Sequence, residues 1–282
     1  MRLRALKGHP RPPAGPLLSA HRGGVGDDPG RENTRDALVD AVLLECEYVE
    51  IDVQRCRGGA HVVHHDDVVL DGDRQVPIST LTLEEFTELG GPRLMLDEAL
   101  EVLRGRKKVH LDLKFLSDPD DGGDIGHGHE VALVEQVIDI MGAGNVVVTT
   151  LEDESVRAIR RWSRTRYPDL LVGLSLGRDV EGPLRWGSLA TRLGEVFPAR
   201  RVRRCDANLV VCHKAIASLR VAAWAARNGL PLLVWTVDEP RELRSWLRDP
   251  RVWLITTNFP RRAARLRREL GVAPKIDGAP SP

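Results

Sequence analysis

The feature of this sequence that most constrains its fold is a regular alternation of short apolar runs with longer amphipathic stretches. Short runs rich in Val, Ile and Leu predict buried strands, whereas apolar residues spaced three and four apart predict helices. Strands are expected at Leu17–Ala20, Tyr48–Val53, Val109–Leu113, Asn145–Thr149, Leu170–Leu174, Ala207–Val211, Leu232–Thr236 and Val252–Thr256. Helices are expected at Thr34–Glu45, Glu130–Met141, Glu152–Thr165, Lys214–Asn228, Pro240–Leu247 and Pro260–Leu270.

Strands that alternate with helices indicate parallel βα units, and the length of 282 residues suits one closed barrel. An open doubly wound sheet is disfavoured because no Gly-rich dinucleotide fingerprint follows the first strand. We therefore predict an α/β fold that is a single (β/α)8 TIM-type barrel. It is expected to span residues 17–272, between an N-terminal extension of residues 1–16 and a C-terminal tail of residues 273–282. A further short strand, Ala60–His64, is expected to pair outside the barrel series.

Composition narrows the classes of partner. The 41 Lys and Arg residues balance the 41 Asp and Glu residues, so no net field directs the protein to nucleic acid or to a charged membrane. Aromatic residues make up 4% of the chain, too few for a platform that stacks single-stranded nucleic acid. No apolar stretch approaches the roughly 20 residues that span a bilayer, and no apolar signal-peptide segment follows the first charges. We expect a cytoplasmic protein without stable membrane insertion, in an oligomeric state that the sequence does not define.

Two of the predicted strands carry charged residues on one face. Side chains alternate between the two faces of a strand, so Glu50 and Asp52 lie opposite the apolar residues of segment 48–53. In the next strand, His110, Asp112 and Lys114 likewise lie opposite the apolar residues. Because the apolar faces must pack on the helices, we expect the charged faces to point into the barrel.

Carboxylates inside a barrel are costly unless they are paired or bind a metal ion. Glu50, Asp52 and Asp112 would form an all-oxygen site, which suits a hard divalent cation, Mg²⁺ or Ca²⁺, and not zinc. The alternative is an ion-pair network of these carboxylates with Lys114 and nearby arginines. The residue types alone leave both interpretations open.

Two histidines point to catalysis. His21 and Arg22 follow the first strand, at the end where barrel enzymes carry their catalytic groups. His65 follows the short strand Ala60–His64. Histidine is suited to proton transfer near neutral pH, and here it accompanies three carboxylates, an arginine and a lysine. This combination predicts a site for a phosphate ester.

Seven short motifs occur in a fixed order from about residue 17 to about residue 270, which is nearly the whole chain. They are His21-Arg22-Gly23, Glu32-Asn33-Thr34, Glu50-x-Asp52, His65-Asp66, Asp112-Leu113-Lys114, Val234-Trp235-Thr236-Val237 and Ile255-Thr256-Thr257-Asn258-x-Pro260. This series resembles the signature of the glycerophosphodiester phosphodiesterase family. The resemblance implies metal-dependent hydrolysis of a small glycerophosphodiester to glycerol 3-phosphate and an alcohol.

The resemblance also implies roles by position. The catalytic acid–base pair would be His21 and His65. The phosphate would be bound by Arg22 and Lys114, and the divalent cation by Glu50, Asp52 and Asp112.

Three further motif positions would support the site. Glu32 would orient the loop that carries His21, and Asn33 and Thr34 would cap the first helix. Trp235 would either contact the glycerol or head group of the substrate or fill the barrel core.

The chain departs from the family pattern in ways that leave the released alcohol open. Asp112 stands where most of the family carries Glu, which is one methylene longer, and Asn258 replaces the final Asp. The insertion after the second βα unit, Asp67–Lys107, is shorter than the usual segment that contacts substrate. The alternative functions are a lysophospholipase D-like enzyme that acts on lipid phosphodiesters and, from another class, a non-catalytic protein that binds phosphodiesters.

Overall fold

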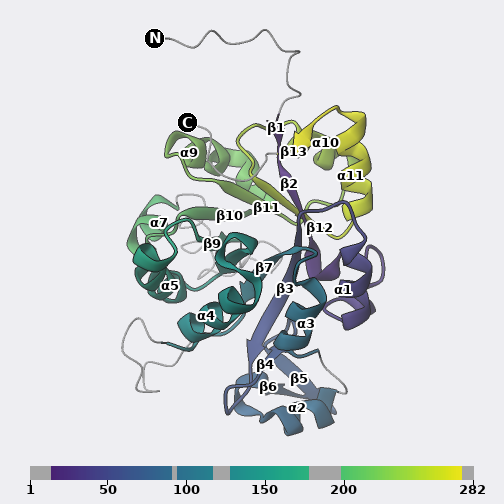
Figure 1. The fold of residues 1–282 in the computed structure, drawn as a ribbon, viewed down its shortest axis with the longest axis vertical. Coiled ribbons are helices and arrows are strands. Elements are labelled where there is room, and N and C mark those ends of the chain that lie inside the picture. The colour runs from purple at the N-terminus through teal and green to yellow at the C-terminus, as the bar shows by residue number, and fades with distance from the viewer. Residues whose placement is uncertain (1–13, 91–93, 117–127, 178–197, 275–282) are drawn as a thin grey trace.

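The computed structural model describes residues 14–90, 94–116, 128–177 and 198–274, and shows a closed barrel. Strand β2 pairs in parallel with both β3 and β12, so the sheet closes on itself (Figure 1). The predicted (β/α)8 barrel is therefore confirmed. Its parallel strands are β2 (Leu17–Ala20), β3 (Tyr48–Arg55), β7 (Lys108–Leu113), β8 (Val146–Thr150), β9 (Leu171–Leu176), β10 (Leu209–His213), β11 (Leu232–Trp235) and β12 (Leu254–Thr257).

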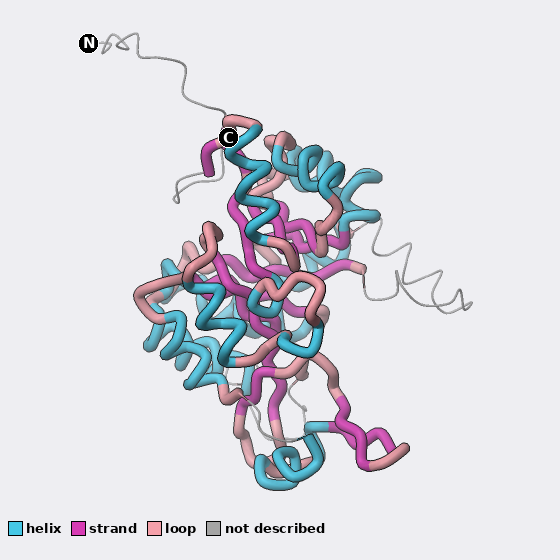
Figure 2. Tube along the Cα trace, turned by 90° about the vertical axis from the view of Figure 1, so that its right-hand side faces the viewer, coloured by secondary structure: helices cyan, strands magenta, loops and turns pink. Residues whose placement is uncertain are grey.

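Helices follow the strands along the chain and form the outer layer of the barrel (Figure 2). Two of them, α3 and α7, were not predicted from the sequence, and the predicted helix Lys214–Asn228 consists of α8, a π-helical turn at Ala217–Val221, and α9. The helices around the barrel are α1 (Arg35–Val42), α3 (Leu96–Leu103), α4 (His129–Met141), α5 (Asp153–Arg166), α7 (Ala199–Cys205), α8 (Lys214–Ile216), α9 (Ala222–Arg227), α10 (Pro240–Leu247) and α11 (Pro260–Glu269).

Strand β3 shows how the sequence pattern places the site. Val49, Ile51 and Val53 are fully buried and belong to the main apolar core, which also contains residues of the surrounding helices. Alternation along the strand therefore turns Glu50 and Asp52 into the barrel, where both are buried as well. The prediction that the charged faces of the strands point inward is confirmed.

A small subdomain is inserted between β3 and α3 and projects at the lower end of Figure 1. Strand β4 (His61–Val63) runs antiparallel to the last residues of β3, so the predicted extra strand does pair outside the barrel series. A hairpin of β5 (Val68–Asp71) and β6 (Arg74–Pro77) and the helix α2 (Leu83–Gly90) complete the subdomain. Its separate apolar core consists of Cys56, Val62, Val69, Ile78, Leu81 and Phe86.

At the amino end of the barrel, β1 (Ala14–Gly15) pairs in parallel with β13 (Ala273–Pro274). The remaining residues of the predicted extension and tail, 1–13 and 275–282, lie outside the described residues. Within the part of the chain that the structure describes, no helix is both long enough and apolar enough to cross a membrane.

Candidate active site

A cavity of about 590 Å³ opens at the carboxyl end of the barrel strands. The loops and strand ends that surround it come from positions far apart in the sequence, which is how barrel enzymes assemble their sites. All of the predicted site residues line this one cavity: His21, Arg22, Glu32, Glu50, Asp52, His65, Asp112, Lys114 and Trp235. The structure thus brings together the residues that the sequence motifs singled out.

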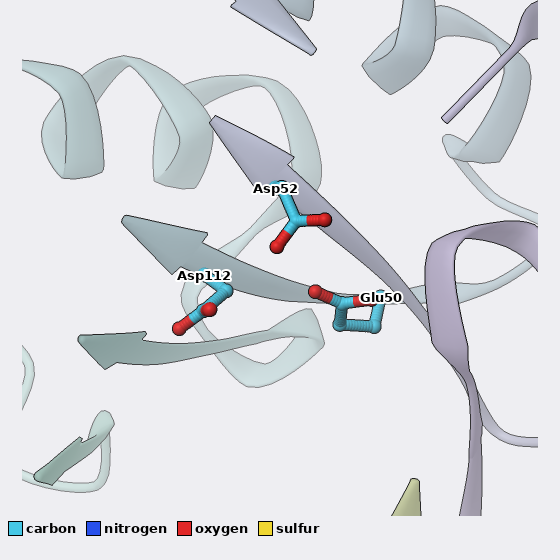
Figure 3. Close-up of side chains that lie close together, drawn as sticks. All are labelled: Glu50, Asp52 and Asp112. Carbon is cyan, nitrogen blue, oxygen red and sulfur yellow. The ribbon is translucent and has the colours of Figure 1, made fainter. Parts of the chain in front are cut away.

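The three predicted cation ligands lie side by side on β3 and β7 (Figure 3). In the register of these strands, Asp52 pairs with Asp112, and Glu50 lies one layer deeper. One oxygen atom from each carboxylate lies within 4.8 Å of the other two. Oxygen atoms at this spacing can share one hard cation.

The same carboxylates also form ion pairs, as the alternative interpretation of the sequence proposed. Lys114 Nζ lies 3.1 Å from Asp52 Oδ1 and 2.5 Å from Asp112 Oδ2. Arg22 Nε lies 3.0 Å from Asp52 Oδ2. Asp52, which is 1% exposed, is therefore bridged by two cations, and the ion pairs and the acidic cluster are parts of one site.

Burial and these charges move the acid–base equilibria of the cluster. Burial favours the protonated form of Asp52, but Lys114 and Arg22 outweigh it and hold the pKa of Asp52 well below its usual range. Burial alone would lower the pKa of Lys114, but Asp112 and Asp52 raise it above its usual range. For Glu50, burial and the charges of Asp52 and Asp112 act together, so its pKa lies well above the usual range.

The position of Glu50 fits a bound cation. Within the described residues, its carboxylate forms no ion pair with a Lys or Arg side chain; Oε2 accepts a hydrogen bond from the Arg22 backbone N–H (2.7 Å) and lies 4.0 Å from His21 Nε2. A buried carboxylate is costly to ionise, and burial together with the charges of Asp52 and Asp112 outweighs Arg22 and Lys114 in raising the pKa of Glu50. A divalent cation shared with Asp52 and Asp112 would add the positive charge that this cluster lacks, so these residues fit Mg²⁺ or Ca²⁺.

The turn after β2 holds Arg22 in a rare backbone conformation. Arg22 has a φ of +48°, in the left-handed region that costs a non-glycine residue roughly 1–3 kcal/mol. The turn is fixed on both sides, because Glu50 accepts from the Arg22 N–H and the Arg22 carbonyl accepts from the Asn33 N–H (3.1 Å). Glu32 Oε2 accepts from Arg22 Nη1 at 2.7 Å, which is the contact expected of a residue that orients this loop.

The next residue, Gly23, has a φ of +90° and packs against α1. A Cβ atom at Gly23 would lie 2.8 Å from the Cβ atom of Ala37. Only glycine fits both the conformation and the space.

His21 is held by a chain of hydrogen bonds that determines which of its nitrogens carries a proton. The Asp238 carboxylate can only accept, so Asn258 Nδ2 donates to it (2.9 Å) and Asn258 Oδ1 faces His21. Asn258 Oδ1 therefore accepts from His21 Nδ1 at 2.7 Å, and Nε2 carries the lone pair. Burial, followed by the charge of Arg22, lowers the pKa of His21.

His65 also lines the cavity, from the loop after β4. Its side chain is 42% exposed, and Nδ1 hydrogen bonds to Asp66 Oδ1 at 2.8 Å. The buried side chain of Gln54 anchors the backbone of this loop, because its Nε2 donates to the carbonyls of Asp66 (2.9 Å) and His65 (3.3 Å). His65 thus enters the site from the inserted subdomain.

The remaining predicted residues have the following places. Trp235 packs on the apolar residues inside the barrel and also lines the cavity, so its contact with the substrate stays a prediction. Thr34 caps α1 by accepting from the Ala37 N–H. The prediction that Asn33 shares this capping role is wrong, because Asn33 Nδ2 donates to Asp52 Oδ2 at 2.8 Å.

Several residues that line the cavity were not predicted to have a role. Asp238 lies three residues after Trp235 and supports Asn258, which the sequence identified only as a departure from the family pattern. Thr149 lies beside Asp112 on β8, and His110 lies one layer deeper on β7. The only sequence signal for them was that His110 shares a strand face with Asp112.

The sequence is similar to one protein family over most of its length. A profile of the "Glycerophosphoryl diester phosphodiesterase family" matches residues 21–262. The "Glycerophosphodiester phosphodiesterase" of Caldanaerobacter subterraneus is 24% identical over 249 residues, which are 82% of this chain and 90% of that protein. The "Glycerophosphocholine phosphodiesterase GDE1" of Eremothecium gossypii is 37% identical over 76 residues, which are 27% of this chain but 6% of the length of that protein.

A solved structure with a similar fold is an Oleispira antarctica phosphodiesterase in complex with the product sn-glycerol-3-phosphate. It has a TM-score of 0.64 and 18% sequence identity, and the match covers 89% of this chain and 96% of that one. At this identity the likeness supports the fold, whereas the family profile extends over most of the chain and includes every predicted site residue. The chain therefore belongs to the glycerophosphoryl diester phosphodiesterase family.

Proposed function

We propose that this protein hydrolyses glycerophosphodiesters to glycerol 3-phosphate and an alcohol. The observation that carries the proposal is the convergence, in one cavity, of two histidines, an arginine, a lysine and three clustered carboxylates. Acid–base groups and cations around one space are what the cleavage of a phosphodiester requires. The product bound to the Oleispira antarctica phosphodiesterase is the one that this chain would release.

Glu50, Asp52 and Asp112 would hold a divalent cation, Mg²⁺ or Ca²⁺. Such a cation would act as a Lewis acid toward the oxygen atoms of the phosphate. Arg22 and Lys114 lie beside this cluster and would bind the non-bridging phosphate oxygens as negative charge accumulates on them.

The two histidines would transfer the protons. His21 Nε2, which carries the lone pair, would remove the proton of the glycerol hydroxyl next to the phosphate ester. That oxygen would form a bond to phosphorus while the bond from phosphorus to the alcohol oxygen breaks, and His65 would donate a proton to the departing alcohol. In the second half of the reaction, water would open the cyclic phosphate by the reverse transfers, which yields glycerol 3-phosphate.

The direct test is to incubate the purified protein with glycerophosphocholine, glycerophosphoethanolamine and a lysophospholipid, each with Mg²⁺, with Ca²⁺ and with EDTA. We expect cation-dependent release of glycerol 3-phosphate from the soluble diesters. Release of lysophosphatidic acid from the lysophospholipid alone would move the assignment to a lysophospholipase D-like enzyme. Binding of the diesters by the folded protein, without turnover, would support the non-catalytic alternative. Cytoplasmic localisation and the absence of nucleic-acid partners stay predictions from the sequence.

A further inference from the structure

A buried histidine that the proposed reaction does not use lies next to the acidic cluster of Glu50, Asp52 and Asp112. His110 on β7 is 4% exposed, and its ring lies between Ser19 on β2 and Thr149 on β8. His110 Nδ1 is 3.3 Å from Ser19 Oγ, and His110 Nε2 is 3.0 Å from Thr149 Oγ1. Ser19 and Thr149 are themselves buried, so the three side chains form a buried series of polar groups at the base of the cavity.

The Asp112 carboxylate at the end of this series of hydrogen bonds determines which group donates and which accepts in each bond. Lys114 Nζ donates to Asp112 Oδ2 (2.5 Å), and the carboxylate accepts. Thr149 Oγ1, 2.6 Å from Asp112 Oδ1, must therefore donate to it. Because a hydroxyl has one hydrogen, Thr149 Oγ1 must also accept from His110 Nε2, which carries a proton.

The consequence is that the Asp112 carboxylate is held from two sides. Thr149 bonds Oδ1 and Lys114 bonds Oδ2, so the plane of the carboxylate is fixed. The strand register makes this possible, because Asp112 pairs with Asp52 on one side and with Thr149 on the other. His110 lies one layer deeper, beside Glu50, and in turn orients the hydroxyl of Thr149.

We propose that Thr149 and His110 are positioning residues that orient the Asp112 carboxylate toward the divalent cation. The inference rests on the proposed function, because it takes Asp112 as a cation ligand. Partners behind a ligand typically contribute about 10–100-fold to metal affinity.

The test measures the dissociation constant of Ca²⁺ by calorimetry on the whole protein. Thr149→Val keeps the shape of the side chain and removes its hydroxyl, and we expect Ca²⁺ to bind about 10-fold more weakly or worse. Thr149→Ser keeps the hydroxyl and should bind Ca²⁺ nearly as tightly as the wild type. Equal affinity of folded Thr149→Val and wild type would overturn the inference, while wild-type turnover would leave the proposed function intact.

A second pair of variants tests the histidine and does not depend on the stability of Thr149→Val. His110→Gln retains an N–H group at the place of Nε2, whereas His110→Phe does not. Ca²⁺ should bind more weakly to His110→Phe than to His110→Gln. Equal affinities would show that His110 does not help to orient Asp112. A wild-type protein that neither binds Ca²⁺ nor turns over any diester would overturn the proposed function and this inference with it.

Discussion

The two histidines of the site are held by different parts of the molecule. His21 is 15% exposed, follows a barrel strand, and is supported from behind by Asn258 and Asp238. His65 is 42% exposed, belongs to the loop of the inserted subdomain, and is paired with Asp66, which is 68% exposed. The barrel therefore supplies a buried half of the site, and the subdomain supplies a half that faces solvent.

The difference in burial predicts which substitutions should change stability and rate most. When a buried group loses its partner, it stays in a medium of low dielectric constant, and water cannot replace the lost interaction. Exposed ion pairs contribute little, because water and salt screen them. Substitutions behind the barrel half should therefore alter stability and rate strongly, and equivalent substitutions in the subdomain half should alter them weakly.

The largest effect on stability is expected from Asp52→Asn. Asp52 bridges Lys114 and Arg22 and accepts from Asn33, and removal of one member of a buried charge pair costs roughly 3–5 kcal/mol. We expect the free energy of unfolding in EDTA, measured with urea, to fall by that amount. Asp66→Asn, the matched change at the exposed pair, should leave it almost unchanged. Equal losses in the two variants would contradict the contrast.

The pH dependence of stability should reveal the buried His110. Burial lowers the pKa of His110 from 6.5 to about 4, so between these values the unfolded chain binds a proton that the folded protein excludes. Stability must then rise with pH across this window and fall as the pH drops from 6.5 toward 4. The free energy of unfolding of His110→Gln should fall less over this interval, and the difference from the wild type should reach about 3 kcal/mol. Parallel pH profiles of the two proteins in EDTA would argue against a buried, neutral His110.

The support of His21 can be tested through kcat. Asn258→Leu removes the oxygen that accepts from His21 Nδ1, and we expect kcat to fall by about 10–100-fold, as for other partners that orient a working histidine. Asp238→Asn should cause a smaller loss, because it acts one step further away. The ¹⁵N chemical shifts of His21 should show loss of the preferred tautomer in Asn258→Leu. An unchanged tautomer would mean that Asn258 does not orient the ring.

The smallest effect is expected from Asp66→Asn on turnover. The Asn side chain can still accept from His65 Nδ1, and Gln54 still anchors the loop backbone. The loss in kcat should be smaller than that of Asn258→Leu. A larger loss would show that the exposed half of the site is the more sensitive one.

The barrel and the acidic cluster could be predicted because they follow from patterns local to a strand. Alternation in β3 and β7 was enough to place Glu50, Asp52 and Asp112 inside the barrel. The support behind them could not be predicted, because Asn258 meets His21 across 237 positions of sequence and Thr149 meets Asp112 through strand register. Helix α7 was missed because its buried residues are only Val202 and Cys205, too few to show a helical repeat. Helix α3 does carry the helical spacing, at Leu96, Ala99, Leu100 and Leu103, and could have been predicted.

We propose that His21 and His65, from the two halves of the site, act on one phosphodiester. The most direct test is ³¹P NMR of glycerophosphocholine incubated with Ca²⁺ and the wild type, His21→Ala or His65→Ala. We expect the wild type to convert the diester resonance to that of glycerol 3-phosphate, and each variant to be slower by about 10²–10⁴-fold. Conversion at the wild-type rate by either folded variant would contradict a role of that histidine in the reaction.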